Sequence, residues 1–379
     1  MIDPAGVYEI NGLPLEVLEE GAQWKLVLAG VPEGFEPGLI RVDDSTFRVE
    51  RGPMAGALLS FDGHEGGRVG PIPFARLERP YRQLPGYGLR PPPFVPDRER
   101  DGTFRDLLDR TEEGGRVEWD LPYPKHEFVR WAQRLDEFVF HSSTNRGIDE
   151  FQPIRNSMEL LDHGGRGNLG AVYATHDGYW SMFFGIVDRE RLRGSLRNGV
   201  YVWQAPDGRT TTTYQFSLDQ ESLRESPFTK GAVYLLPRST FQRVPHYPGG
   251  PISDEWVSEQ PVSPRASLLV EPDDFPFLDQ IAGHDESEFL GMVDLFRELV
   301  ARATAFDQPE DGGLVIDLEW SLEIDAMYAE WAALADRYMP VVARQLEGEG
   351  DSRTLLLHGP RPYLERVRER LEEFLSGPA

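Results

Sequence analysis

The chain has 379 residues, and its 64 acidic residues outnumber its 39 Lys and Arg residues, which gives a formal net charge of −25. This balance argues against broad, sequence-independent binding to nucleic acid, which needs a basic surface. The sequence contains no cysteine, so disulfides, thiolate metal sites and a cysteine nucleophile are excluded.

No apolar run approaches the ~20 residues needed to cross a bilayer. No basic segment followed by an apolar one marks a secretory signal near the N-terminus. We therefore expect a cytoplasmic, multidomain protein with no membrane partner. A chain of this length predicts two or three domains.

Residues 1–95 are predicted to be rich in β-strand, because Gly and Pro recur between short apolar runs. A small barrel or sandwich would fit this pattern. The proline-rich segment 90–102 cannot hold a helix interior or a central strand, because proline removes a hydrogen-bond donor and fixes φ. Residues 96–121 are therefore predicted to be a linker.

A helix opened by proline is predicted over 122–138, with Phe128, Trp131, Ala132 and Leu135 on one stripe. A strand follows it and ends at His141. Polar side chains come directly after this histidine: Ser142, Ser143, Thr144, Asn145 and Arg146. Imidazole and hydroxyl groups both donate and accept hydrogen bonds, so this cluster could hold a ribose. A purely structural histidine is the alternative.

The segment GRGNLG (165–170) formally matches the dinucleotide fingerprint GxGxxG. That fingerprint has meaning only where it follows a strand and opens a helix. Here it precedes a strand, so a Rossmann fold is rejected and a glycine loop remains. Arg166 on this loop, and Arg155 before it, are candidates for contacting an anion.

The strand 171–175 is followed by a helix for which Asp177 is a candidate cap. Four apolar residues share one stripe of that helix and are interpreted as core: Trp180, Phe183, Phe184 and Val187. Phe183 is also kept among the candidate nucleotide contacts. Tyr173 stands in mid-strand among small residues, where its ring could face a cleft. Two further strands are predicted at 230–244 and 255–270.

Residues 291–379 are predicted to form a small α/β domain. A helix is expected at 292–306, a strand at 311–322, then a long helix, a second strand at 354–359 and a last helix at 360–375. This alternation of strands and helices is typical of a small α/β domain.

The motifs between about 136 and 275 resemble the ADP-ribosyltransferase superfamily. They are the histidine followed by small hydroxyl residues, then GAVYAT with an amphipathic helix behind it, then VYLLP, then EWVS. The segment is most similar to the branch that shares a His–Tyr–Glu signature, which includes diphtheria toxin and the poly(ADP-ribose) polymerases. The resemblance implies an α+β protein in which residues 122–290 form a split antiparallel β fold that binds NAD in a cleft.

By this resemblance, His141 would hydrogen-bond the adenosine ribose with Ser143 close by, and Tyr173 would stack on the nicotinamide, a contact worth ~1 kcal/mol. Glu255 would hold a hydroxyl of the nicotinamide ribose and stabilise the oxocarbenium-like transition state; Glu259 is the alternative carboxylate. The predicted nucleotide-binding residues are His141, Ser142, Ser143, Thr144, Asn145, Arg146, Arg155, Arg166, Tyr173, Ala174, Thr175 and Phe183, with Glu255 as the catalytic residue.

One position departs from the family. Glycine commonly follows the family histidine, whereas Ser142 stands here, and its Cβ could crowd the nicotinamide ring. Three functions therefore stay open. The first is an enzyme that cleaves NAD and transfers ADP-ribose to protein, nucleic acid or water. The second is a non-catalytic module that binds NAD, ADP or ADP-ribose, and the third is an activity like that of an RNA 2′-phosphotransferase. No metal is expected.

Overall fold

The computed structural model describes residues 3–10, 13–82, 84–154, 169–245, 252–309, 313–339, 342–359 and 361–376. It contains both helices and many strands, which confirms a mixed α+β protein. Two compact units are distinguished: the first comprises Met1–Ile154 and Gly170–Asp285, and the second contains Glu286–Ala379. No helix in the described ranges is both long enough and apolar enough to cross a membrane.

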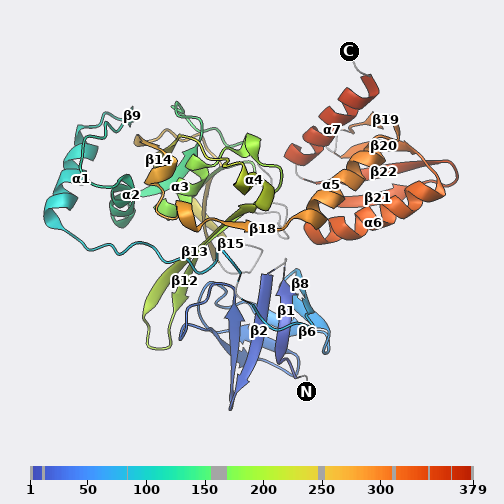
Figure 1. The fold of residues 1–379 in the computed structure, drawn as a ribbon, viewed down its shortest axis with the longest axis horizontal. Helices are drawn as coiled ribbons and strands as arrows, with labels where there is room; N and C mark the ends of the chain where they lie inside the picture. Colours follow the sequence, from blue (N-terminus) through green and yellow to red (C-terminus); the bar gives the residue numbers. More distant parts are fainter. Residues whose placement is uncertain are drawn as a thin grey trace. The chain divides into compact units, whose positions relative to one another are not determined.

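The N-terminal part is a closed barrel of eight antiparallel strands, not a sandwich (Figure 1). The strands are β1 (Gly6–Ile10), β2 (Leu13–Glu20), β3 (Gln23–Leu28), β4 (Gly38–Arg41), β5 (Thr46–Val49), β6 (Leu58–Phe61), β7 (Gly66–Val69) and β8 (Ile72–Arg76). Because β1 pairs with both β2 and β8, the ring is complete. Tyr8, Phe61 and Phe74 fill its interior with edge-to-face contacts, their ring centroids 5.2 to 5.7 Å apart.

The segment 96–121, which was expected to be a linker, contains helix α1 (Arg98–Arg110) and the short strand β9 (Gly115–Arg116). Asp97 caps the helix by accepting a hydrogen bond from the Arg100 backbone. Its buried residues Phe104, Leu107 and Leu108 belong to the core of the central domain. The segment is therefore part of that domain.

The central domain is built on a seven-stranded sheet of order β15-β16-β11-β10-β14-β17-β9. Beyond β9 its strands are β10 (Phe138–Ser143), β11 (Val172–Thr175), β14 (Gly231–Pro237), β15 (Gln242–Pro245), β16 (Ile252–Ser258) and β17 (Ala266–Val270). Three more strands, β12 (Leu196–Gln204), β13 (Thr210–Asp219) and β18 (Ala282–His284), form a second sheet. The α-helices besides α1 are α2 (Lys125–Arg134), α3 (Gly178–Ile186) and α4 (Gln220–Arg224). Single 3₁₀ turns lie at Arg189–Arg191, Arg238–Thr240, Pro272–Asp274 and Leu278–Gln280.

The seven-stranded sheet is divided near its middle. Strand β10 pairs with β14 over six residue pairs, and β11 pairs with β16 over four. Between β10 and β11 there is a single pair, Phe140 with Thr175. The sheet therefore consists of two halves, β15-β16-β11 and β10-β14-β17-β9, that separate beyond this pair.

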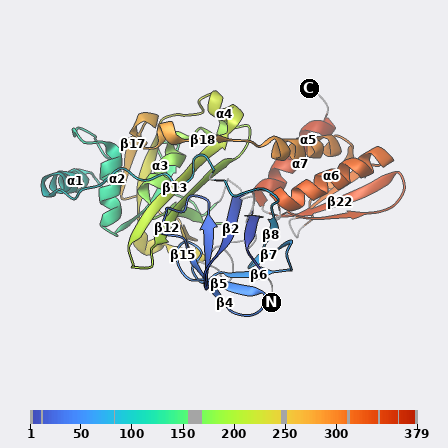
Figure 2. The ribbon, with the colours of Figure 1, turned by 60° about the horizontal axis from the view of Figure 1, so that its bottom comes forward.

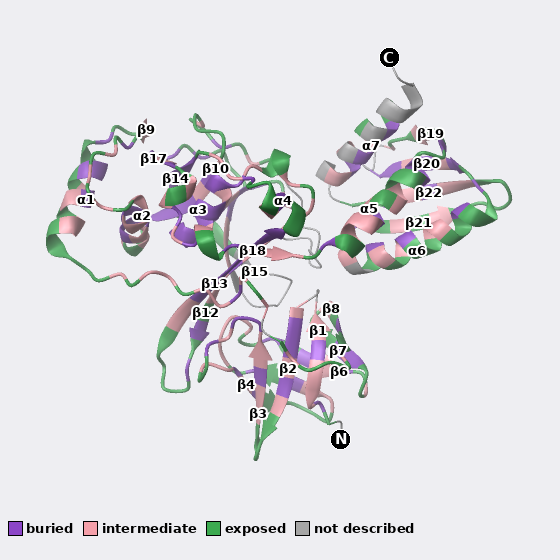
Figure 3. Ribbon diagram, viewed as in Figure 1, coloured by how far each residue is buried: buried purple, intermediate pink, exposed green. Residues whose placement is uncertain are grey.

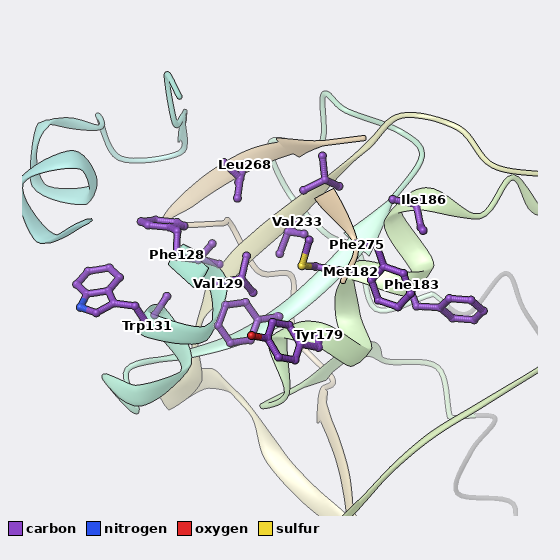
Figure 4. Close-up of a cluster of buried hydrophobic side chains, with 14 of the residues drawn as sticks. Phe128, Val129, Trp131, Tyr179, Met182, Phe183, Ile186, Val233, Leu268 and Phe275 are labelled. Carbon is purple, nitrogen blue, oxygen red and sulfur yellow. The ribbon is translucent and has the colours of Figure 1, made fainter. Parts of the chain in front are cut away.

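Helix α3 packs into the centre of the domain, and seven of its nine residues are buried (Figure 3). Such a helix is apolar on all sides, as GYWSMFFGI is. The side chains of α3 pack with side chains from α2, β14 and β17 in one cluster (Figure 4). Close approach is possible because glycines stand at the contacts: a Cβ on Gly178 would lie 2.2 Å from Cγ1 of Val129.

The second unit is a four-stranded antiparallel sheet of order β19-β20-β22-β21. Its elements are α5 (Ser287–Val300), β19 (Ala303–Asp307), β20 (Leu314–Glu319), α6 (Leu322–Tyr338), β21 (Ala343–Glu347), β22 (Ser352–His358) and α7 (Arg361–Ser376). All three helices pack against one face of the sheet (Figure 2), onto Leu314, Ile316 and Leu318 of β20. The helix expected to reach residue 306 ends at Val300, and β19 follows it.

Candidate functional site

His141 lies at the point where β10 and β11 separate. Its Nδ1 is 2.7 Å from the carbonyl oxygen of Tyr173 on β11, so the imidazole spans the gap between the two halves of the sheet. The ring also packs against Phe151, with centroids 4.7 Å apart. A carbonyl oxygen only accepts, so Nδ1 carries the proton, and Nε2 of the neutral ring is an acceptor.

The surroundings of His141 favour this neutral form. Burial lowers the pKa of the imidazole, the Tyr173 carbonyl raises it in part, and the positive charge of Arg189 lowers it. A neutral imidazole whose Nε2 is an acceptor can receive a hydrogen bond from a hydroxyl group, such as one of a ribose.

We expect His141 to stay neutral at physiological pH and to titrate below its ordinary value of 6.5. Because the folded-state pKa lies below the unfolded one, this histidine lowers the free energy of unfolding as the pH falls below about 6.5. The imidazole resonances in NMR spectra recorded over a pH series report the titration, with His141→Gln to assign the signal. A midpoint at or above the ordinary value would contradict the expectation.

Strand register places Tyr173 and Glu255 together but separates them from His141. Thr175 pairs with Glu255, and Tyr173 pairs with Val257, so these residues share one face of the β11–β16 pair. The opposite face of β11 packs in the cluster that contains Val139 of β10. His141 is two residues after Val139 on β10, so its side chain points to the same face as that of Val139. The imidazole and the Tyr173 ring therefore point to opposite faces of the sheet.

From the sequence we expected the three side chains to line one cleft. In the structure they do not lie on one face of the sheet. They are neighbours through the backbone, because His141 bonds the Tyr173 carbonyl and Glu255 stands on the next strand. The ladder between β10 and β11 consists of the pair Phe140 and Thr175.

Ser142 points into the protein. Its side chain is buried, and its Oγ lies 2.8 Å from Oγ of Ser181 on α3. A Cβ on Gly185 of the same helix would be 3.2 Å from the Ser142 Cβ, so the two elements touch here. The Ser142 side chain is thus directed towards α3.

The loop after β10 is partly ordered by its own polar groups. The Asn145 backbone donates to Oγ of Ser143, and its carbonyl accepts from the Tyr234 hydroxyl at 2.7 Å. Thr144, Asn145 and Arg146 are exposed. Two other candidates, Arg155 and Arg166, lie outside the described residues.

Three predicted contacts are buried by the fold. Phe183 is fully buried, with its ring centroid 4.8 Å from that of Phe216, so it is a core residue, as its place on the apolar stripe of the helix predicts. Ala174 is buried in the cluster with Val139. Thr175 is also buried, and its hydroxyl donates a hydrogen bond to Asp254 and accepts one from the Asp177 backbone.

Asp177 caps α3, as the sequence predicts. Its Oδ1 accepts from the Trp180 backbone at 2.9 Å, and its Oδ2 accepts from the Tyr214 hydroxyl at 2.7 Å. Burial raises the pKa of this carboxyl, and these hydrogen bonds together with the charge of Arg130 oppose the shift. Asp177 therefore fixes the N-terminal end of α3 through these hydrogen bonds.

Asp254 stands directly before Glu255 on β16 and was not among the residues predicted for the site. Its Oδ2 accepts from the Thr175 hydroxyl at 3.1 Å, and its Oδ1 lies 3.3 Å from Nη2 of Arg243. Burial, with a smaller effect from the nearby Asp177, raises its pKa to about 6. In the sequence, the one feature that could have drawn attention to Asp254 is its position next to Glu255.

No group of three or more His, Asp or Glu side chains in the described ranges is arranged to hold a metal ion. Comparison of the chain with known protein families, with curated proteins and with solved structures found no match in any of the three. A function for the chain is therefore inferred from its residues and their geometry.

Proposed function

We propose that this chain is an ADP-ribosyltransferase-like protein that binds NAD, cleaves the bond between nicotinamide and ribose, and transfers ADP-ribose to an acceptor. The observation that carries the proposal is the split sheet, where β10 and β11 share one residue pair and His141 bonds across the gap to Tyr173. The order His141, Tyr173, Glu255 along the chain resembles the His–Tyr–Glu signature of the ADP-ribosyltransferases and supports the proposal.

Each residue has a role that its chemistry allows. Nε2 of neutral His141 accepts a hydrogen bond from a ribose hydroxyl, and the Tyr173 ring supplies a surface for the nicotinamide. The carboxylate of Glu255 holds the second ribose and stabilises the positive charge that develops there as the bond to nicotinamide breaks. The electron pair of that bond leaves with neutral nicotinamide, and a nucleophilic oxygen or nitrogen of the acceptor forms the new bond and releases its proton to solvent.

Ser142 is compatible with this chemistry. Its side chain is buried and hydrogen-bonded to Ser181, so it is held against α3. The backbone of β10 thus offers a ligand the same groups that a glycine would offer.

Replacing Ser142 with glycine is accordingly expected to leave nicotinamide release close to the wild-type rate. The variant should lose about 1–2 kcal/mol of unfolding free energy, from the lost hydrogen bond and the greater chain freedom of glycine. Urea unfolding and an assay of nicotinamide release measure both effects. A large gain in activity would show instead that Ser142 obstructs the site.

A second candidate is a non-catalytic module that senses NAD or ADP-ribose. The opposite orientation of His141 and Tyr173 favours it, because binding tolerates a looser arrangement than catalysis. The acceptor in the first proposal, whether protein, nucleic acid or water, is left to experiment.

The proposal is tested with the full chain and NAD labelled in its nicotinamide ring. Calorimetry measures binding, and separation of free nicotinamide over time measures cleavage, with and without added protein or nucleic-acid acceptors. Binding together with release supports the enzyme, and binding without release under all conditions supports the sensor. If neither NAD nor ADP-ribose binds, both proposals fail.

A further inference from the structure

Asp254 joins the three strands of one half of the central sheet. It stands on β16 directly before Glu255, accepts a hydrogen bond from Thr175 on β11, and faces Arg243 on β15. Thr175 is the residue that pairs with Glu255 across the β11–β16 ladder. The carboxylate of Asp254 therefore forms a diagonal link beside the proposed catalytic residue.

The link continues into the core. Oγ1 of Thr175 accepts from the Asp177 backbone at 3.0 Å while donating to Asp254, so one hydroxyl connects the two acidic residues. Asp177 caps α3 and is held by the Tyr214 hydroxyl. The segment of β16 that carries Glu255 is thereby tied to α3, seven of whose nine residues are buried.

We propose that Asp254 is a positioning residue for Glu255, whose carboxylate fixes β16 against β11 and β15 and so sets where Glu255 stands relative to Tyr173. This inference rests on the proposed function, because the position of Glu255 matters only if Glu255 acts on a ligand. Asp254 itself is not required to touch that ligand.

The ionised carboxylate can accept from both partners of this link, although burial favours the neutral carboxyl. One oxygen serves the Thr175 hydroxyl and the other serves the Arg243 guanidinium, and both partners are donors. An amide offers one acceptor and one donor, so Asn at this position satisfies one partner and presents an N–H to the other. The charged groups that face Asp254 are Arg243 from β15 and Asp177 from the start of α3.

The pH dependence of this link follows from its surroundings. Burial raises the pKa of Asp254 to about 6, so the carboxyl is ionised in neutral solution and takes up a proton below this value. We expect nicotinamide release to decline as the pH falls through about 6, because protonation breaks the attraction to Arg243.

The test is Asp254→Asn in the full chain. At about pH 8 we expect its turnover number for nicotinamide release to fall about tenfold, with the affinity for NAD unchanged. The decline near pH 6 should be present in the wild-type profile and reduced in the variant. Thr175→Val, which removes the other end of the link, should lower turnover in the same way and move the decline to higher pH, because the Thr175 hydroxyl lowers the pKa of Asp254.

Asp136→Asn is the matched control. Asp136 also pairs with an arginine, Arg238 at 2.7 Å, and its Oδ1 lies 3.2 Å from Nε2 of His176, but neither partner stands on β11, β15 or β16. Its positive φ of 58° is one that asparagine readily adopts. This variant should retain wild-type turnover and pH dependence.

A second measurement does not depend on NAD. Because the folded-state pKa of Asp254 lies above the ordinary value of 3.8, the carboxyl contributes stability at low pH that is lost as the pH rises through about 6. Urea midpoints should show this loss for the wild-type chain and less of it for Asp254→Asn.

The outcomes separate the two proposals. If the wild-type chain releases no nicotinamide under any condition, the proposed function fails and the positioning role fails with it. If the wild-type chain turns NAD over and Asp254→Asn matches its turnover and pH profile, the positioning role alone is overturned.

Discussion

Replacing Glu255 with glutamine is expected to lower the rate of nicotinamide release by about 100- to 1,000-fold, with little change in the affinity for NAD. The amide has nearly the same shape as the carboxylate and still accepts a hydrogen bond from a ribose hydroxyl. It lacks the negative charge that stabilises the cationic sugar as the bond breaks. Because that charge develops only in the transition state, the loss appears in turnover and not in binding.

The matched control for Glu255→Gln is Glu259→Gln. Glu259 is exposed and follows the end of β16 at Ser258, so the same chemical change is made one residue beyond the strand. Single-turnover release of labelled nicotinamide and calorimetric binding are measured for both variants. Wild-type turnover by Glu255→Gln, or an equal loss in Glu259→Gln, would remove Glu255 from the catalytic role.

Replacing Phe183 with alanine is expected to lower the free energy of unfolding of the first unit by about 3–5 kcal/mol. The side chain is fully buried, and its ring lies 4.8 Å from Phe216 and 6.0 Å from Phe275, measured between centroids. Truncation removes these contacts and leaves a cavity that a helix packed on all sides cannot collapse to fill.

Phe184→Ala is the comparison for Phe183→Ala. Phe184 is the next residue of α3 but only half-buried, with the guanidinium of Arg189 5.2 Å from its ring centroid. Its truncation should cost about 1 kcal/mol, in proportion to the smaller area removed from water. Urea unfolding followed by circular dichroism measures both variants. Equal losses would show that Phe183 is not the deeper residue of the pair.

The elements of the chain that carry their own local signals could be predicted from the sequence. The strand at Val172–Thr175, the cap at Asp177 and the helix after it are adjacent, so periodicity and capping chemistry identify them together. The β-rich N-terminal part was predictable for the same reason. Whether it closed into a barrel depended on the pairing of β1 with β8, and no local pattern encodes that pairing.

Other elements were missed where a stronger signal lay nearby. The prolines before α1 suggested a linker, although Phe104, Leu107 and Leu108 have helical spacing. The β12–β13 hairpin turns at Asp207-Gly208, a dipeptide typical of such turns, and its strands were not predicted. Strand β19 was predicted as part of the helix before it, because a short apolar run fits the period of a helix as well as that of a strand.

The candidate site was predictable as a set of residues but not as a geometry. The face to which a strand residue points depends on register, and a shift of one residue reverses it. The orientation of His141 relative to Tyr173 therefore required the pairing of Phe140 with Thr175. The bond from His141 goes to a backbone carbonyl, and the role of Asp254 arises from a neighbouring strand, so neither leaves a pattern in the sequence.

The closure of the N-terminal barrel has a consequence for how the protein is synthesised and truncated. Strand β1 pairs with β2 at once, but its other edge waits until β8 has been made, and Arg76 of β8 then donates across the seam to the Ala5 carbonyl. During that interval the edge of β1 can pair with other chains. Removing β1 makes the hazard permanent, because β2 and β8 each become a free edge, and such a truncated chain should aggregate where the intact one does not.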